Sequence, residues 1–262
     1  MRYELLGSLR IIDERGTVTP SPHKMEILLA TLLARSDQLV TTGELYLELW
    51  GGRAPRRANA SLHVYVSQLR QFLNRDRRSK TPIVTQPPGY LIHVGTDEVD
   101  AHDFQRLLDR GREELADGRF EAASRTVQTA LALWQGPPLD DLREGPIVNS
   151  YVVWLEEAKV ECTEILIEAL LRLGRHREVI GTLRTLVLEH PLREKLYRYL
   201  MLALHHSDRR AEALQVYQTA RGLLRSELGI EPCRSLRELH QHILNDDAPV
   251  TASAVDTLLS ST

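Results

Sequence analysis

Residues 56–90 read RRANASLHVYVSQLRQFLNRDRRSKTPIVTQPPGY, and this stretch decides how the first part of the chain folds. Apolar residues recur in it at the spacing of one helical face: Leu62, Val66, Leu69 and Leu73. Such a stripe predicts an amphipathic helix packed on a core. We expect Asn59 to cap its start, because an asparagine side chain can accept a hydrogen bond from a first-turn N–H group.

A β-hairpin is predicted directly after this helix. The Ile-Val-Thr sequence at residues 83–85 and the apolar residues within 90–94 are typical of two short strands. Pro88 and Gly89 lie between them and suit the centre of a type II turn, in which glycine supplies a positive φ. A helix followed at once by a hairpin predicts a winged helix-turn-helix, whose helix enters the major groove of DNA.

Basic residues accumulate on and beside the predicted helix: Arg56, Arg57, Arg70, Arg75, Arg77, Arg78 and Lys80. One acidic residue, Asp76, lies among them. A cluster of this sign is typical of nucleic-acid binding, but a solvated surface helix can look the same. The rest of the chain has to decide between these two interpretations.

The composition is that of a globular protein with room for two domains. The 262 residues are 42% hydrophobic and 26% charged, as in ordinary soluble proteins. Cys162 and Cys233 are too few for a disulfide framework and lack the spacing of metal ligands. The first residues resemble neither a signal nor a transit peptide, and no apolar run approaches the ~20 residues that span a bilayer. We expect a cytoplasmic protein that associates with the nucleoid and not with a membrane.

Charge is unevenly distributed along the chain. Residues 1–95 contain 13 Lys and Arg against 8 Asp and Glu, whereas residues 96–262 contain 20 against 28. The net charge is therefore +5 in the first part and −8 in the second. This asymmetry favours a basic module for a polyanion joined to an acidic module with another task, although modest differences of this kind are common.

The residues before position 56 complete the first domain. Residues 1–20 alternate between tight turns and predict three short strands. Ser-Pro at residues 21–22 suits the N-cap and first position of a helix. Thr41 with Glu44 is a capping-box pattern for a second helix, which Gly-Gly at residues 51–52 ends. The predicted inward residues are Met25, Leu28, Leu29 and Leu32 in the first helix and Leu45, Tyr46, Leu49 and Trp50 in the second.

Three segments of this first domain resemble the OmpR-type winged helix: PHKMEILLATLLARSDQLVTTGELYLELWG, RRANASLHVYVSQLRQFL and TQPPGYLIHV. More narrowly, they are similar to its version in the Streptomyces antibiotic regulatory proteins. The shared signals are LW-G at the end of the second helix, YVSQLR in the third and P-GY in the hairpin. In that family the winged helix comes first, as it does here. Since no receiver domain precedes it, aspartyl phosphorylation is not expected as an input.

The helical step of 100° separates the faces of the third helix. With the apolar stripe inward, the outward residues are predicted to be Ala60, Val64, Ser67, Gln68 and Gln71. His63 and Arg70 fall on one flank, and Ser61 and Tyr65 fall on the other. The hairpin tip lacks a basic residue for a minor-groove contact, and Tyr90 is expected to be a packing residue.

The resemblance implies DNA contacts from the positions that match Ser61, Tyr65, Ser67, Gln68 and Arg70. Arg70 is expected to read a base, because its guanidinium can bond a guanine edge in bidentate fashion. Arg57 and Arg75 are expected to position phosphates, together with Ser61 and Tyr65. The complete set of candidate DNA-binding residues is Arg56, Arg57, Ser61, His63, Tyr65, Ser67, Gln68, Arg70, Gln71 and Arg75.

Residues 96–101 form a polar, acidic junction, beyond which no strand pattern is visible. Helical runs are predicted at about residues 102–116, 119–134, 150–173, 175–189, 192–206, 209–227 and 235–245. Three similar pieces, ADGRFEAASRTVQTALALW, RLGRHREVIGTLRTLVLEHP and HSDRRAEALQVYQTARGLL, align Arg119, Arg175 and Arg209. The second interval is 34 residues, the tetratricopeptide period. The first is 22 residues longer, mostly through the inserted stretch QGPPLDDLREGPIVNS, which we expect to be a loop.

This second part resembles the bacterial transcriptional activation domain of the same family, which has a tetratricopeptide-like fold. The matching pieces include ALALWQGPPLDDL, EHPLREKLYRYLMLALHHSDRRAEALQVYQTARGLLRSELGIEP and LRELHQHIL. We therefore predict a mainly α fold with a small β component. Its parts are an N-terminal winged helix-turn-helix (residues 1–96), an all-α tetratricopeptide-like domain (97–245) and a disordered tail (246–262).

These expectations favour a sequence-specific transcriptional activator of an antibiotic or other secondary-metabolite gene cluster. By resemblance, its partners are promoter DNA with direct repeats and RNA polymerase holoenzyme including the sigma factor, and it binds DNA as a homodimer. Two alternatives remain: an interaction adaptor whose winged helix does not bind DNA, and a repressor. No enzyme, cofactor or metal is expected, because no catalytic or phosphate-binding motif is evident and Cys233, His240 and His242 lack zinc-ligand spacing.

Overall fold

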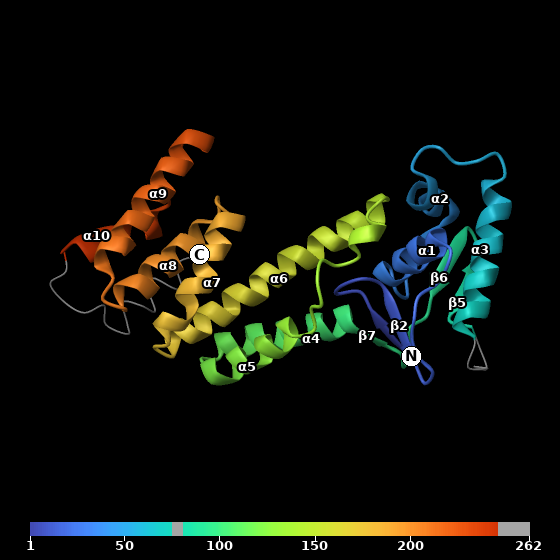
Figure 1. Cartoon of the computed structure of the whole chain (residues 1–262), viewed down its shortest axis with the longest axis horizontal. Coiled ribbons are helices and arrows are strands. Elements are labelled where there is room, and N and C mark those ends of the chain that lie inside the picture. The colour runs from blue at the N-terminus through green and yellow to red at the C-terminus, as the bar shows by residue number, and fades with distance from the viewer. Residues whose placement is uncertain (75–80, 246–262) are drawn as a thin grey trace. The chain divides into compact units, whose positions relative to one another are not determined.

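The computed structural model describes residues 1–74 and 81–245, which fold mostly into helices with two small sheets (Figure 1). Arg75 and the tail from residue 246 lie outside the described residues. Contacts divide the chain into two compact units. Unit 1 contains residues 1–109 and 129–161, and unit 2 contains residues 110–128 and the chain from Cys162 onward. The predicted class, a winged helix-turn-helix followed by an all-helical part, is confirmed.

The first sheet of unit 1 combines the N-terminal strands with a segment from far along the chain. β1 (Arg2–Glu4), β2 (Arg10–Asp13) and β3 (Gly16–Val18) are the three predicted strands and pair in antiparallel fashion. β7 (Glu98–Val99) pairs in parallel with β1, which gives the order β3-β2-β1-β7. The predicted polar junction therefore contains a strand that is too short for alternation to reveal it.

The first helix confirms the predicted element but not its predicted cap. α1 (His23–Ala34) begins after Pro22, which has the extended backbone of an N-cap residue, with φ −79° and ψ 172°. No side chain caps the helix, so the expected cap from Ser21 was wrong. Proline takes the N-cap position itself and leaves Ser21 one residue too far upstream. The predicted inward residues of this helix are all buried.

The second helix begins and ends as predicted. α2 (Thr42–Trp50) carries the capping box: the N–H of Glu44 donates to Thr41 Oγ1 (3.3 Å) and the N–H of Thr41 donates to Glu44 Oε2 (2.8 Å). Gly51 follows it with a positive φ of 56°. Of the predicted inward residues, the two leucines are buried and the two aromatic residues are half-buried.

The third helix starts two residues earlier than expected. α3 (Ala58–Leu73) has Arg57 at its N-cap position, with no side-chain cap. Asn59 lies inside the first turn, so the predicted cap from Asn59 was wrong. The reason is the preceding loop, which already turns at Pro55: its carbonyl oxygen accepts the N–H of Ala58 at 2.9 Å.

The predicted hairpin is present as part of a second sheet. β5 (Ile83–Gln86) and β6 (Gly89–Ile92) form it, and β4 (Val40–Thr41) pairs with β6 from the other side. The expected type II turn was wrong, because Gly89 is the first residue of β6 and has no positive φ. Glycine is needed there for another reason: a Cβ would overlap the carbonyl oxygen of Val40 on the neighbouring strand.

Helices follow near the predicted places: α4 (Asp100–Ala116), α5 (Phe120–Leu131) and α6 (Pro146–Arg172). The inserted stretch, residues 135–150, is a loop only in part: it contains the short 3-10 helix η1 (Asp140–Leu142), and α6 begins inside it, four residues before its predicted start. Its first residues are hydrogen-bonded to the loop between β1 and β2. The N–H groups of Gln135 and Leu139 donate to the carbonyl oxygens of Leu6 and Gly7, both at 2.8 Å. The division of the chain after residue 96 stays a prediction, since unit 1 extends well beyond it.

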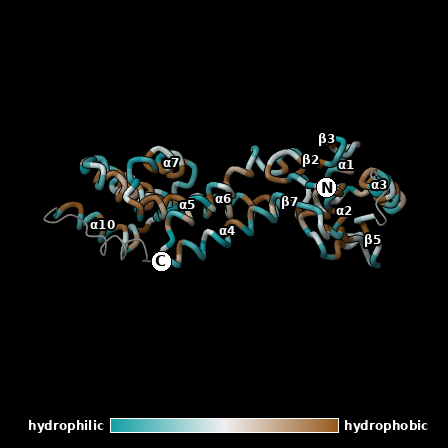
Figure 2. The backbone as a smooth tube through the Cα atoms, turned by 90° about the horizontal axis from the view of Figure 1, so that it is seen from below, coloured by the Kyte–Doolittle hydropathy of each residue, from teal (hydrophilic) through white to brown (hydrophobic). Residues whose placement is uncertain are grey.

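Unit 2 contains helices at the predicted positions: α7 (His176–Glu189), α8 (Glu194–His205), α9 (Arg210–Leu228) and α10 (Arg234–Asn245). Leu183, Tyr199, Leu200 and Leu239 are buried among them. The tube in Figure 2 changes repeatedly between hydrophilic and hydrophobic along these helices, as expected where helices pack through one face. Within residues 1–74 and 81–245, no helix is long and apolar enough to cross a membrane.

The same turn precedes each of the three aligned arginines. Arg119, Arg175 and Arg209 follow residues at positive φ, namely Gly118 (72°), Gly174 (74°) and Asp208 (62°). Each arginine N–H donates to the carbonyl oxygen five residues earlier, at 2.8, 2.9 and 2.9 Å. This is the Schellman arrangement, in which a left-handed residue lets the chain satisfy the last carbonyls of one helix before the next begins. The alignment of the three pieces thus marks one repeated structural turn.

Candidate nucleic-acid interface

The two faces of α3 differ as the helical step predicted. The stripe of Leu62, Val66, Leu69 and Leu73 is at most 2% exposed. The five predicted outward residues, Ala60, Val64, Ser67, Gln68 and Gln71, are all exposed. The outer face therefore presents one hydroxyl and two amides, groups that can bond base edges in the major groove.

One flank of α3 contacts the hairpin, which lies beside the helix in Figure 1. Arg70 donates from Nε to the carbonyl oxygen of Ile83 (3.1 Å) and from Nη2 to Oγ1 of Thr85 (2.7 Å). Its guanidinium also lies 5.9 Å from the ring centroid of Tyr90. Arg70 therefore holds β5 against the helix. Reading of a guanine by Arg70 stays a prediction, and a bidentate contact would require these donors to turn away from the hairpin.

His63 reaches the same hairpin from two turns earlier in α3. The hydroxyl of Tyr90 and Nδ1 of His63 are 2.9 Å apart and hydrogen-bonded. The tyrosine is 2% exposed, which confirms it as a packing residue. Burial raises the pKa of its hydroxyl, and the positive charge of Arg70 opposes this only in part. His63 and Arg70 were placed on one flank from sequence, and that flank faces the wing.

The opposite flank of α3 contacts α2 through aromatic rings. Tyr65 lies 6.4 Å from Trp50, which lies 5.8 Å from Tyr46 (ring centroids). Tyr65 is half-buried, so it helps to fix the angle between the two helices as well as presenting a hydroxyl. Ser61 is half-buried on the same flank, one turn after Arg57.

The loop between α2 and α3 supplies the basic groups. Arg53, Arg56 and Arg57 are all exposed in it. Arg57 stands at the N-cap of α3, where first-turn N–H groups and the helix dipole already favour an anion. Two of these arginines were among the candidate residues, and Arg75, a further candidate, lies outside the described residues.

One buried polar residue of α2 was missed by the sequence analysis. Glu48 is 1% exposed, and its carboxylate accepts the N–H groups of Ile147 and Val148 at the start of α6. A signal for it was present: at the helical step, Glu48 falls on the inward side of α2 near Leu45 and Leu49. An acid at such a position predicts a specific partner, although not which one.

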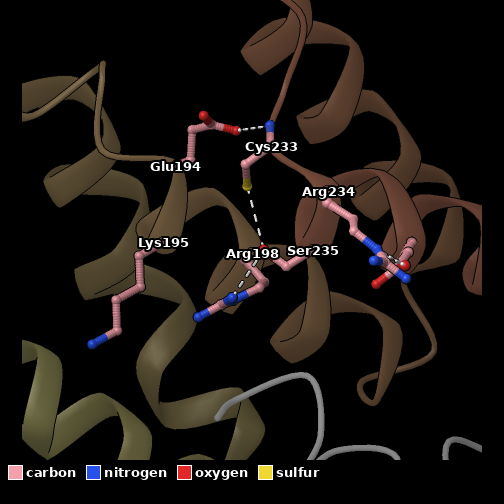
Figure 3. A pocket seen from close by; sticks show the side chains of 7 residues that line it. Glu194, Lys195, Arg198, Cys233, Arg234 and Ser235 are labelled. Carbon is pink, nitrogen blue, oxygen red and sulfur yellow. Dashed lines mark hydrogen bonds and ion pairs between the residues drawn. The ribbon is translucent and has the colours of Figure 1, made fainter. Parts of the chain in front are cut away.

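Unit 2 contains a polar cavity of about 660 Å³ between the first turns of α8 and α10 (Figure 3). Its groups bond one another. Glu194 accepts the N–H of Cys233 (2.6 Å), Arg198 donates to Ser235 (3.1 Å), and Arg234 pairs with Glu238. No group of three or more His, Cys, Asp or Glu could hold a metal ion in the part of the chain that the structure describes.

Family models match both parts of the chain. The bacterial transcriptional activator domain model matches residues 99–244, and the model described as "Transcriptional regulatory protein, C terminal" matches residues 16–92. Among curated relatives, the regulatory protein DnrI of Streptomyces peucetius is 32% identical over 94% of this chain and 93% of its own length. The regulatory protein AfsR of Streptomyces griseus is 34% identical over 97% of this chain, but only 26% of its own length.

A solved structure has the same fold. Mycobacterium tuberculosis EmbR, in complex with a low affinity phosphopeptide, is 35% identical, with a TM-score of 0.90. The similarity covers 98% of this chain and 68% of EmbR. The chain has a winged helix whose third helix has an exposed outer face, and an activator domain follows it in the sequence. The relatives match both parts in the same order. The chain belongs to the Streptomyces antibiotic regulatory protein family of transcriptional regulators.

Proposed function

We propose that this regulator is a sequence-specific DNA-binding activator of a secondary-metabolite, and specifically antibiotic, gene cluster, acting on the nucleoid in the cytoplasm. The observation that carries the proposal is the outer face of α3, where Ser67, Gln68 and Gln71 are exposed beside the basic loop before the helix. Exposed amides on a helix that is fixed from behind by a buried leucine stripe are suited to reading bases.

The candidate residues divide into three roles in this proposal. Gln68 and Gln71 read bases, because a glutamine amide can bond an adenine edge with two hydrogen bonds. Arg56, Arg57 and Ser61 position phosphates at the start of the helix. Arg70 and His63 hold the hairpin at the correct distance from α3, which supports an indirect role for Arg70 beside the base contact expected from sequence.

Two protomers bind direct repeats in this proposal, and the acidic part of the chain recruits RNA polymerase with its sigma factor. A spacing of about 10–11 base pairs places both recognition helices on one side of the duplex. Insertion of about 5 base pairs between the half-sites should then abolish binding, because it rotates one half-site to the opposite side. Undiminished affinity after the insertion would exclude head-to-tail binding on direct repeats.

The proposed function is tested by fluorescence anisotropy on promoter and scrambled DNA across a salt series. Gln68→Ala should lose about 1–3 kcal/mol on promoter DNA alone. Arg57→Ala should weaken binding to both DNAs and lower the salt slope by about one ion, because one fewer counterion is released. Wild-type protein that binds neither DNA at ~150 mM salt would contradict the proposal and favour the adaptor, and equal binding to both DNAs would contradict sequence-specific recognition. Specific binding without activation in a purified transcription assay would favour the repressor.

Arg70 is examined in the same series. A base contact by Arg70 predicts that Arg70→Ala loses affinity only on promoter DNA and relaxes preference at one base pair. A wing-holding role predicts that Thr85→Val, which removes one partner of the guanidinium, reproduces part of the same loss. Equal losses on both DNAs with a changed salt slope would make Arg70 a phosphate contact.

A further inference from the structure

The buried carboxylate of Glu48 lies on α2, the helix whose Trp50 contacts Tyr65 on one flank of α3. It accepts hydrogen bonds from two backbone N–H groups, those of Ile147 and Val148, which are about 100 residues further along the chain. These groups belong to the first turn of α6, where a helix has no internal partner for its N–H groups. Glu48 therefore caps α6 from another helix.

A carboxylate suits this position physically. The positive end of the α6 dipole favours an anion, and two N–H donors offset the cost of burying the charge. Burial raises the pKa of the Glu48 carboxyl, whereas the N–H groups of Ile147 and Val148 act to lower it. A side chain without acceptor oxygens would leave both donors buried without a partner, which is costly.

The chain is closely fitted around this carboxylate. A Cβ added at Gly145 would overlap the Glu48 carboxyl group, so only glycine allows the approach without a shift. The next residue upstream is held by α1 instead: Glu144 pairs with Lys24 (3.1 Å) and with His23 (3.3 Å). Residues 144–148 are thus fastened to both helices that support α3.

We propose that Glu48 is a positioning residue through which the DNA-binding helices hold the start of α6, so that occupation of α3 by DNA and the anchoring of α6 are energetically coupled. The inference rests on the proposed DNA binding by α3. α6 runs without interruption from Pro146 to Arg172 and supplies residues to both units. By thermodynamic linkage, DNA that favours an arrangement of α2 and α3 in which the Glu48 contact is stronger or weaker alters the stability of that contact by the same free energy.

The test is amide hydrogen exchange on the full chain, with and without promoter DNA. Glu48→Gln removes the charge and leaves one acceptor for two donors. Its amides at Ile147 and Val148 should exchange about tenfold faster than in the wild type, because a lost hydrogen bond lowers the free energy of local opening. In the wild type, saturating DNA should change the exchange of these two amides at least about fivefold, the low end of typical coupling factors. In Glu48→Gln this response to DNA should be lost.

The matched control is Glu44→Gln, one turn earlier on α2. It removes the same charge, but Glu44 bonds only Thr41 within the capping box and does not contact α6. Both variants replace a glutamate of α2 by its amide, and only the first should loosen the start of α6. Equal exchange rates in the two variants would overturn the positioning role.

A second variant approaches the contact from the α6 side. Gly145→Ala should push the chain away from Glu48 and speed exchange at Ile147 and Val148, with the sequence of α2 unchanged. DNA affinity is measured on every sample by anisotropy. DNA binding without any response of the two amides would overturn the coupling and leave the proposed function standing. A wild type that does not bind DNA would overturn both.

Discussion

Units 1 and 2 are held together in different ways. In unit 1, buried carboxylates join segments that are 94–100 residues apart: Asp100 accepts the N–H groups of Leu5 and Leu6, and Glu48 accepts those of Ile147 and Val148. In unit 2, the same local turn follows three helices. Helices that are neighbours in the sequence also pack against one another. The difference teaches that the DNA-binding unit depends on a few long-range polar contacts, whereas the repeat depends on many short-range ones.

The largest expected effect comes from the core behind the recognition face. Leu69→Ala should lower the free energy of unfolding of unit 1 by about 2–5 kcal/mol, because the fully buried leucine leaves a cavity. Val64→Ala on the exposed face of the same helix is the control and should stay within about 0.5 kcal/mol. Hydrogen exchange should show the loss in unit 1 while Leu200 in unit 2 stays protected. An equal loss in both units would show that they unfold together and would remove the distinction.

Acid should act on unit 2 through a histidine cluster. The rings of His206 and His176 stack at 4.5 Å, and burial, followed by the charges of His176, His205 and His242, lowers the pKa of His206 to about 4. The folded state therefore resists protonation that the unfolded chain accepts below about 6.5. The contribution of neutral His206 to the stability of unit 2 is therefore fully present above about pH 6.5. It is lost as the pH falls towards 4, which lowers the free energy of unfolding by up to about 3 kcal/mol. Chemical denaturation of His206→Phe across this range should show a flatter profile, and an unchanged slope would contradict the assignment.

Asp100 should give unit 1 a slope of the opposite sign in the same range. Burial raises the pKa of this carboxyl to about 6, although three backbone N–H groups act to lower it. The folded state then keeps a proton that the unfolded chain has lost, so this group makes unit 1 less stable as the pH rises from about 4 to 6, by at most about 3 kcal/mol. Asp100→Asn should remove the slope and, with one acceptor fewer, cost about 1–3 kcal/mol. Parallel pH profiles for the two proteins would contradict this.

The smallest effects are expected at the repeated turn. Asp208 occupies the left-handed position that glycine holds at residues 118 and 174. Asp208→Gly should stabilise unit 2 by about 0.5–1 kcal/mol, because glycine adopts this backbone without strain. Gly174→Ala should destabilise it by about 1 kcal/mol at the equivalent position. Thermal unfolding of both variants measures the difference, and a loss on Asp208→Gly would show that the aspartate side chain contributes more than its backbone costs.

The sequence was informative where one local pattern implies one structure. Leucines at helical spacing predicted both faces of α3, and Thr41 with Glu44 predicted a capping box that forms as expected. The aligned arginines marked the repeated turn. Predictions that depended on contacts between distant segments were less successful. Gly89 was assigned a positive φ, but a glycine is required there because β4 passes too close to leave room for a Cβ. The caps expected from Ser21 and Asn59 failed because the first helix begins one residue later than the pattern implies and the third begins two residues earlier.

The candidate site divides in the same way. Which residues of α3 face outward follows from the 100° step alone, because a helix built on one buried stripe has no freedom to rotate. The helical step does not predict the partners of the α3 side chains. Partners such as Ile83, Thr85 and Tyr90 are brought to α3 only when the hairpin folds back on it. The sequence by itself therefore determined the helices, the repeat and the outward face of α3, all of which depend on residues a few positions apart. Only the tertiary structure decided that Arg70 holds the wing and that Glu48 caps α6, since a buried charge takes its partner from whatever donor the fold places beside it.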